Sequence, residues 1–134
     1  MSVKAVAKGI RMPARKVSVV AALVRGRTVN DAIVILENTP RASALPVKKV
    51  IESAKANADY NHNYKPDSLK IVEITVTPGT SLKRYRPAAR GRALPYQLRS
   101  SHITVIVDGE KRAPKKPAAT KAKEEKETKK EGDK

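Results

Sequence analysis

One stretch of this chain has too few apolar side chains to fold on itself. Residues 78–100 contain six basic residues, no acidic residue, no Val and no Ile, and Pro87 and Pro95 interrupt them. Connections longer than about 12–15 residues are usually functional or disordered, and a two-stranded ribbon of this composition is not stable alone in water. With both arms extended at ~3.3 Å per residue, the stretch would reach roughly 35 Å. We therefore expect an arm that becomes ordered only against a partner, and its charge predicts an anionic partner.

Charge is distributed in blocks along the chain, whose net charge is +16. Residues 1–30 hold seven basic and no acidic residues, residues 31–73 hold six of each, residues 74–107 hold six basic and no acidic residues, and residues 108–134 hold ten basic and seven acidic residues. A solvated surface loop is the alternative for the arm, but solubility does not require that acids be excluded from 34 consecutive residues. Self-repulsion of this kind is relieved when a polyanion binds.

The composition also indicates the compartment and the domain organisation. Cysteine is absent, which excludes disulfides and thiolate metal sites and favours a reducing compartment. The apolar run of residues 19–24 is far shorter than the about 20 residues of a membrane span, and Lys4, Lys8 and Arg11 interrupt any signal peptide. We expect a cytoplasmic protein with no membrane contact and no homo-oligomer. Residues 1–112 are expected to form one RNA-binding domain that includes the arm, and residues 113–134 a disordered charged tail.

The period of the apolar residues predicts an α+β fold. A short strand over residues 2–8 is followed by helices that begin at Pro13, near Thr28 and near Ser43, and end at Gly26, Asn38 and Tyr60. The buried positions expected in the second and third helices are Ala32, Ile33, Ile35, Leu36, Val47, Val50, Ile51, Ala54 and Ala58. Residues 69–76 and 103–107 are rich in β-branched residues and are predicted to be strands. A three-stranded antiparallel sheet packed on three helices accounts for these elements.

Catalytic and metal-binding chemistry finds little support in the sequence. The two histidines, His62 and His102, have no patterned nucleophile nearby, and His102 is expected to pack or to hydrogen-bond within a strand. The spacing of Asp59, His62 and Asp67 matches no defined metal-ligand pattern. We expect no enzyme activity, no cofactor and no metal site.

The kind of nucleic acid can be narrowed from the side chains available. Arginine outnumbers lysine five to one in the arm, and guanidinium groups fork onto phosphates and stack on bases. Without Phe or Trp the chain lacks the aromatic sheet face of single-strand readers, which leaves shape and phosphate recognition of a large folded RNA. Cations at the start of the first helix favour a phosphate partner, although surface solvation explains them equally well. The expected RNA-binding residues are Lys4, Lys8, Arg11, Arg15, Lys16, Arg25, Arg27, Lys83, Arg84, Tyr85, Arg86, Arg90, Arg92, Tyr96 and Arg99.

Several segments, taken in order, resemble one protein family. The segments MPARKVSVVAALVRGR, TVNDAIVIL, VKKVIESAKANADYN, LKRYRPAARGRA and SSHITVIV are similar to the bacterial type of the large-subunit ribosomal protein 22 family, over residues 2–108. The resemblance implies a small domain on the large ribosomal subunit with a long protruding β-hairpin threaded through 23S rRNA. It also implies contacts with neighbouring ribosomal proteins and transient contact with the nascent peptide in the exit tunnel. The tunnel tip would comprise Arg86, Pro87, Ala88, Ala89, Arg90, Gly91, Arg92 and Ala93.

Two segments depart from the family pattern, and two other functions stay open. The returning arm LPYQLRSS is less basic than is usual in the family, and the tail after residue 112 is not a family feature. One alternative function is a free-standing basic nucleic-acid chaperone or DNA-compacting protein. The other is an enzyme with an RNA substrate, for which the sequence offers no nucleophile–base pair.

Overall fold

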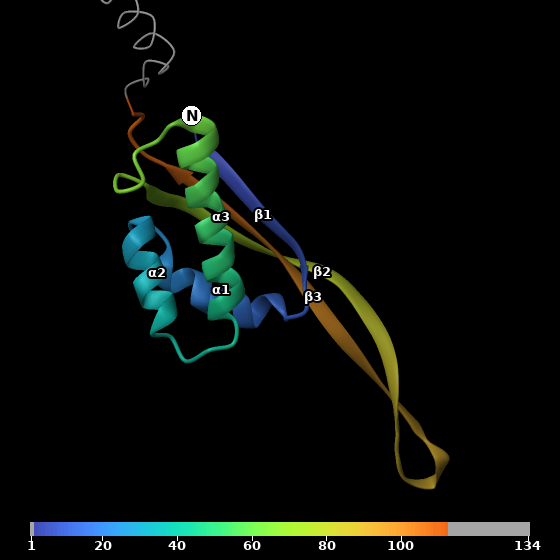
Figure 1. Ribbon diagram of the computed structural model, residues 1–134. Coiled ribbons are helices and arrows are strands. Elements are labelled where there is room, and N and C mark those ends of the chain that lie inside the picture. Colours follow the sequence, from blue (N-terminus) through green and yellow to red (C-terminus); the bar gives the residue numbers. More distant parts are fainter. Residues whose placement is uncertain (1, 113–134) are drawn as a thin grey trace, which may run out of the picture.

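The computed structural model describes residues 2–112, and Figure 1 shows three helices beside a sheet from which a hairpin projects. The elements in chain order are β1 (Val3–Ile10), α1 (Ala14–Val24), α2 (Val29–Glu37), α3 (Ala44–His62), β2 (Lys70–Pro87), the short 3-10 turn η1 (Ala89–Gly91) and β3 (Ala93–Asp108). The predicted α+β class is confirmed. The expected disorder of residues 113–134 falls outside the described residues.

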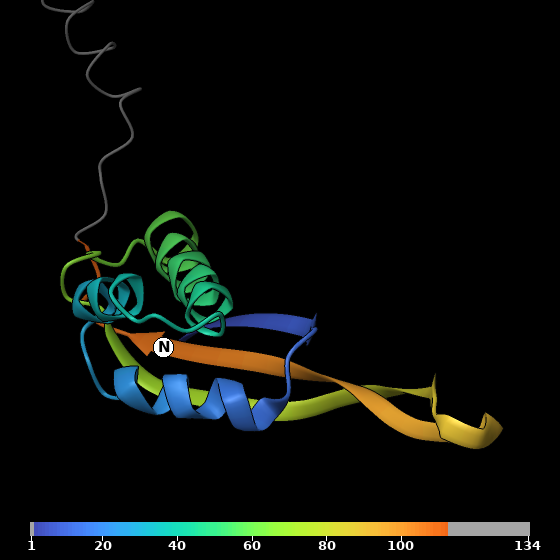
Figure 2. The ribbon, with the colours of Figure 1, turned by 90° about the horizontal axis from the view of Figure 1, so that it is seen from below.

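The sheet has β3 as its central strand. Its order is β1-β3-β2, with both pairings antiparallel, so Val105 faces Ala5 on one side and Ile74 on the other. Ile103, Val105 and Val107 are fully buried, whereas the residues between them are half-buried. This period of two places the helices on one face of the sheet. Contacts run mainly from α3 to β1 and β3 and from α1 to β2, as Figures 1 and 2 show.

The ends of the first two helices follow the sequence signals. Pro13 is the N-cap residue of α1, and Gly26, with φ of 75°, follows its C-terminal end. Thr28 caps α2 by accepting the backbone N–H of Asp31 at 3.3 Å. The Thr28 hydroxyl also donates to the Asp31 carboxylate at 2.7 Å. The predicted capping box is therefore present in a modified form, with the acid bonded to the side chain of the cap residue.

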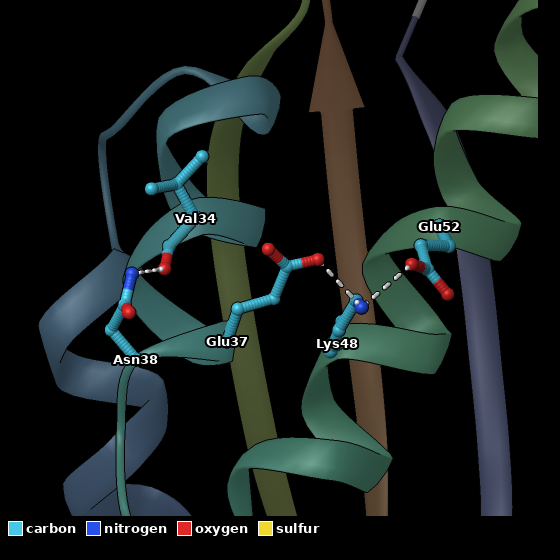
Figure 3. Close-up of polar contacts among 5 residues, drawn as sticks. All are labelled: Val34, Glu37, Asn38, Lys48 and Glu52. Carbon is cyan, nitrogen blue, oxygen red and sulfur yellow. Dashed lines mark hydrogen bonds and ion pairs between the residues drawn. The ribbon is translucent and has the colours of Figure 1, made fainter.

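The C-terminal end of α2 is tied to α3 by an ion-pair bridge (Figure 3). Lys48 on α3 lies 2.8 Å from Glu37 on α2 and 3.5 Å from Glu52 one turn along its own helix. Asn38 closes α2 by donating its side-chain amide to the Val34 carbonyl at 2.9 Å. The hydrogen bond from Lys48 to Glu37 raises the pKa of the Lys48 ammonium above its ordinary value. The stabilisation that Lys48 contributes is therefore present at neutral pH and is lost as pH rises through that raised pKa.

The core is almost entirely aliphatic. All the predicted stripe residues of α3 are buried, and so are Ala32 and Leu36 of α2. Ile33 and Ile35 are only half-buried, because α2 presents a narrower face to the core than expected. Tyr64, which is 1% exposed, is the largest fully buried side chain of the described part. Its burial, together with the nearby Asp108 carboxylate, raises the pKa of the Tyr64 phenol.

The β2–β3 ladder extends well beyond the part of the sheet that the helices cover. Leu82 faces Leu98, Arg84 faces Tyr96 and Pro87 faces Ala93. Residues 78–100 therefore form the long β-hairpin that the resemblance implies, which is confirmed, and its strands extend beyond the ends that the apolar pattern predicts at residues 76 and 103. Backbone pairing requires no apolar side chains, so the ladder continues where burial stops. No residue from 81 to 99 is buried, and Figures 1 and 2 show this hairpin free of the helices.

A joint of irregular backbone lies where the hairpin leaves the domain. Register shifts occur between Ala7 and Ile10 on β1 and between Pro78 and Ser81 on β2. His102, on β3 between them, accepts the backbone N–H of Gly9 at its Nδ1 at 2.9 Å. This hydrogen bond confirms the structural role expected for His102. Bulges increase local twist and bend a strand, so the joint sets the direction of the hairpin.

Within residues 2–112, no helix is both long enough and apolar enough to cross a membrane.

The joint predicts that Gly79→Ala destabilises the protein by about 1–3 kcal/mol. A Cβ at Gly79 would lie 2.6 Å from Oγ of Ser100 and 3.0 Å from Cε1 of His102. Urea unfolding of the free protein measures the loss. Adding Ser100→Ala removes the nearest atom and should restore part of the stability. A Gly79→Ala protein as stable as the wild type would contradict this packing.

The burial pattern predicts uneven amide exchange in the free protein. Amides of residues 82–98 should exchange much faster than those of residues 71–76, because the hairpin has no buried side chains to protect its ladder. Hydrogen–deuterium exchange followed by NMR measures both sets in one sample. Slow exchange throughout the hairpin would show that it folds unaided.

Candidate nucleic-acid interface

The hairpin presents two faces of different composition. Directly paired residues in an antiparallel ladder point to the same side. The first face carries Ser81, Lys83, Tyr85, Pro95, Gln97 and Arg99, and the second carries Leu82, Arg84, Arg86, Leu94, Tyr96 and Leu98. The two tyrosines predicted to bind RNA therefore lie on opposite sides.

The second face combines cations with exposed apolar groups. Leu82, Leu94 and Leu98 are each more than half exposed. The guanidinium carbon of Arg86 lies 5.8 Å from the centre of the Tyr96 ring, within cation–π range. That contact joins Arg86 on β2 to Tyr96 on β3 across the strand pair. A shallow surface hollow is lined by Lys83, Tyr85, Pro95, Gln97 and Arg99 of the first face together with Tyr96 of the second.

The tip turns within a few residues. The Ala88 N–H donates to the Arg92 carbonyl at 2.8 Å, and Arg92 N–H donates to Ala89 at 3.4 Å. Gly91 has φ of 68°, as its predicted role in a turn requires, and Arg90 has φ of 58°. A non-glycine residue in the left-handed region costs roughly 1–2 kcal/mol. Arg90 is thus held at the tip in a conformation that Gly or Asn would adopt more easily.

A groove at the base of the hairpin joins the two acid-free segments. It is lined by Pro13, Ala14 and Arg15 from the start of α1 and by Pro78, Gly79, Ser81, Gln97, Arg99 and Ser100 from the hairpin. The first turn of α1 contains no acidic residue and no side-chain cap. Its free N–H groups and partial positive charge add to the two arginines. The structure therefore brings Arg15 and Arg99 together, although 84 positions separate them in the sequence.

Other predicted residues lie apart from this groove. Lys4 faces Ile106 on the sheet, away from the hairpin. Arg25 and Arg27 follow the opposite end of α1, where Arg25 donates to the Ile74 carbonyl at 3.1 Å and Arg27 to the Leu23 carbonyl at 3.1 Å. Both guanidinium groups are therefore already hydrogen-bonded to backbone carbonyls of the domain. Lys8 and Arg11 lie at the hairpin end of β1, since Ile10 between them pairs with Ser101.

Within residues 2–112 the cations of the hairpin form no ion pair. The ion pairs within residues 2–112 involve Lys48, Lys65 and Arg112, all outside residues 81–99. Arg41 is an exposed cation that is not among the residues predicted to bind RNA. It lines a hollow with Met12, Lys16, Ala42 and Ser43. Arg41 lies in the charge-balanced segment of residues 31–73, so the distribution of charge along the sequence did not single it out.

Metal-binding geometry does not form among the described residues. They contain no group of three or more His, Cys, Asp and Glu side chains that is placed to hold a metal ion. Asp59 lies 3.4 Å from Arg112, and Asp67 accepts from Asn30 at 3.3 Å, so these two acids have other partners. His62 packs edge-on against Tyr64, with ring centres 6.5 Å apart.

Comparison with known proteins identifies the family. The family described as "Ribosomal protein L22p/L17e" matches residues 5–108. The "Large ribosomal subunit protein uL22" of Oceanobacillus iheyensis is 49% identical over 111 residues, which cover 83% of this chain and 98% of that protein. The proteins of the same name from Clostridium tetani and Herpetosiphon aurantiacus are 48% and 49% identical, and the matches cover 80% and 81% of this chain and 96% of each relative. The resemblance seen in the sequence is thereby confirmed, and the chain belongs to the ribosomal protein L22p/L17e family, a family of structural ribosomal proteins and not of enzymes.

Proposed function

We propose that this protein is a structural component of the large ribosomal subunit that binds 23S rRNA and assists its assembly. One observation carries the proposal: a long hairpin with six cations, no acid and no buried residue projects from the domain. Such a segment gains its order from a phosphate-rich scaffold that surrounds it. The curated relatives carry the large ribosomal subunit in their names, which supports the same scaffold here.

The two faces of the hairpin explain how it would be held. Tyr85 and Arg99 point to one side, and Arg84, Arg86 and Tyr96 to the other. A hairpin that lies on one flat surface would use only one of these sets. Insertion between two RNA segments uses both, with arginine forks on phosphates and rings on bases. We infer that the hairpin bridges separate parts of the rRNA.

The tip is suited to the wall of the nascent-peptide exit tunnel. Ala88, Ala89, Gly91 and Ala93 are small, so they offer little contact area to a passing peptide. Arg90 and Arg92 would hold the turn against rRNA phosphates. In this proposed role the protein lies in cytoplasmic ribosomes, where it contacts neighbouring large-subunit proteins and, transiently, the nascent peptide.

The proposal predicts a steep salt dependence of binding to 23S rRNA. If roughly eight phosphates are contacted, log affinity should fall with log salt at a slope near −6 to −7. The Arg84→Ala/Arg86→Ala variant should reduce that slope by about 2. Filter binding of the purified full chain to a 23S rRNA transcript at several salt concentrations measures it. The matched control is Lys49→Ala/Lys70→Ala, which removes two exposed cations outside the acid-free segments and should change the slope much less.

Duplex DNA as a competitor separates this function from that of a free-standing chaperone or DNA-compacting protein. At moderate salt, an equal mass of duplex DNA should displace little of the bound rRNA, because the hairpin needs a folded RNA around it. Equal competition by DNA would favour the chaperone instead. In the salt titration, equal slopes for the Arg84→Ala/Arg86→Ala variant and the Lys49→Ala/Lys70→Ala control would show that the hairpin is not part of the RNA interface.

A further inference from the structure

We propose that the open edge of β1 and the neighbouring face of α3 form a docking groove for an extended, acidic segment of another protein. The inference rests on the proposed function and deepens it, because it gives one place at which a neighbouring large-subunit protein would bind. In the described part of the chain, β1 is an outer strand of the sheet and pairs only with β3. Alternate residues of an edge strand present their backbone N–H and C=O groups away from the sheet, where a further strand can pair with them.

A hollow of about 300 Å³ lies between this edge and α3, which packs against β1 (Figures 1 and 2). Ala5, Val6 and Ala7, three consecutive residues of β1, line it. Successive side chains of a strand point to opposite faces, so a hollow that touches all three follows the edge of the strand. The α3 side is a stripe at helical spacing. The remaining lining residues are Ile10 of β1 and Pro46, Lys49, Val50 and Ser53 of α3.

A strand edge beside a helix face can bind a peptide as an added strand. The backbone of the peptide pairs with the edge, and its alternate side chains enter the groove. Most residues that line this hollow are apolar, and Val6 among them is 45% exposed, which favours an aliphatic side chain in the hollow. RNA has no main-chain amides with which to extend a β-ladder. A protein segment therefore fits this edge better than an RNA strand does.

The charges around the groove favour an acidic partner. Lys4 and Lys8 of β1 and Lys49 of α3 are exposed, and none of them forms an ion pair within residues 2–112. The residues that line the hollow include no acid, and Glu52 of α3 bonds to Lys48. A second copy of this chain would bring its own edge lysines beside these, and like charges on adjacent strands repel. Asp and Glu side chains on a different segment would be attracted.

A synthetic ten-residue peptide that alternates valine and glutamate is the probe for the free protein. In an NMR titration at neutral pH, amides of residues 3–8 and 46–53 should shift most, and hydrogen exchange of β1 amides should slow because an added strand protects them. The same peptide with every backbone amide methylated should not bind, since it keeps its side chains and loses its ladder N–H groups. Equal binding by the methylated peptide would overturn the added strand.

Two variants on exposed positions of α3 test shape and charge separately. Ser53→Arg places a long side chain at the hollow and should weaken peptide binding at least tenfold. Lys49→Glu should weaken it about threefold to tenfold, and should improve binding of a valine–lysine peptide by a similar factor. Ser53→Ala is the matched control and should bind like the wild type, and thermal melting checks that each variant is folded. Wild-type binding by folded Ser53→Arg would overturn the groove.

Cross-linking in assembled large subunits identifies the occupant. The photo-reactive residue benzoylphenylalanine replaces Val6 in one full-length chain and Tyr85 of the hairpin in another. The chain altered at Val6 should cross-link to an acidic segment of a neighbouring large-subunit protein, which mass spectrometry identifies. A synthetic peptide of that segment should then displace the valine–glutamate peptide from the free protein.

The same experiment separates this inference from the proposed function. Cross-links from position 6 only to rRNA, to a second copy or to residues 113–134 of the same chain would overturn the groove, and so would the absence of any cross-link. Cross-links from position 85 to rRNA would leave the proposed function standing in each of these cases. If both chains are folded and neither enters large subunits, the proposed function fails, and the peptide titration still decides whether the groove binds an added strand.

Discussion

The backbone ladder between β2 and β3 is the constraint on which the rest of the structure depends. On the domain side, the paired residues alternate between the aliphatic core and the open face, and the core holds the strands in register. Beyond the joint, the same ladder continues with exposed side chains only. Main-chain hydrogen bonds determine the geometry of the hairpin there, and side chains contribute little to its stability. The same pair of strands therefore forms part of the folded domain and the hairpin that projects from it.

The arrangement of charge follows the same division. Acids of the described part lie on α2 and α3, at Asp67 and Glu110, and at Glu73 and Asp108 on the domain part of β2 and β3. Glu37 of α2 bonds Lys48 of α3 and so links two helices. The start of α1 and the hairpin contain none. A folded domain tolerates balanced charge on its solvent side. A surface that binds RNA has a higher affinity when it contains no acidic residues, because carboxylates repel phosphates. Under the proposed function, the RNA-binding side and the solvent side of the domain are thus already separated in the sequence.

Local signals in the sequence were enough to predict most of the fold. The caps at Pro13 and Thr28, the stripe of α3 and the β-branched runs at residues 69–76 and 103–107 each determine one element. The apolar pattern alone placed the strand ends at residues 76 and 103, because backbone pairing leaves no such pattern when neither face is buried, and the long hairpin was expected only from the family resemblance. Which hairpin residues share a face also required the register, because the bulge at Pro78–Ser81 shifts it.

The joint beneath the hairpin gives small backbone changes a large effect at the far end. Nine residues of β2 lie beyond Pro78, and at ~3.3 Å per residue they form a lever of roughly 30 Å. A tilt of about 10° at the bulge would displace the tip by about 5 Å on that estimate. Gly9, Gly79 and His102 therefore determine together the direction in which the hairpin projects, although none of them lies near its tip. Substitutions at these three residues are expected to displace the tip of the hairpin in the ribosome even when the domain itself stays folded.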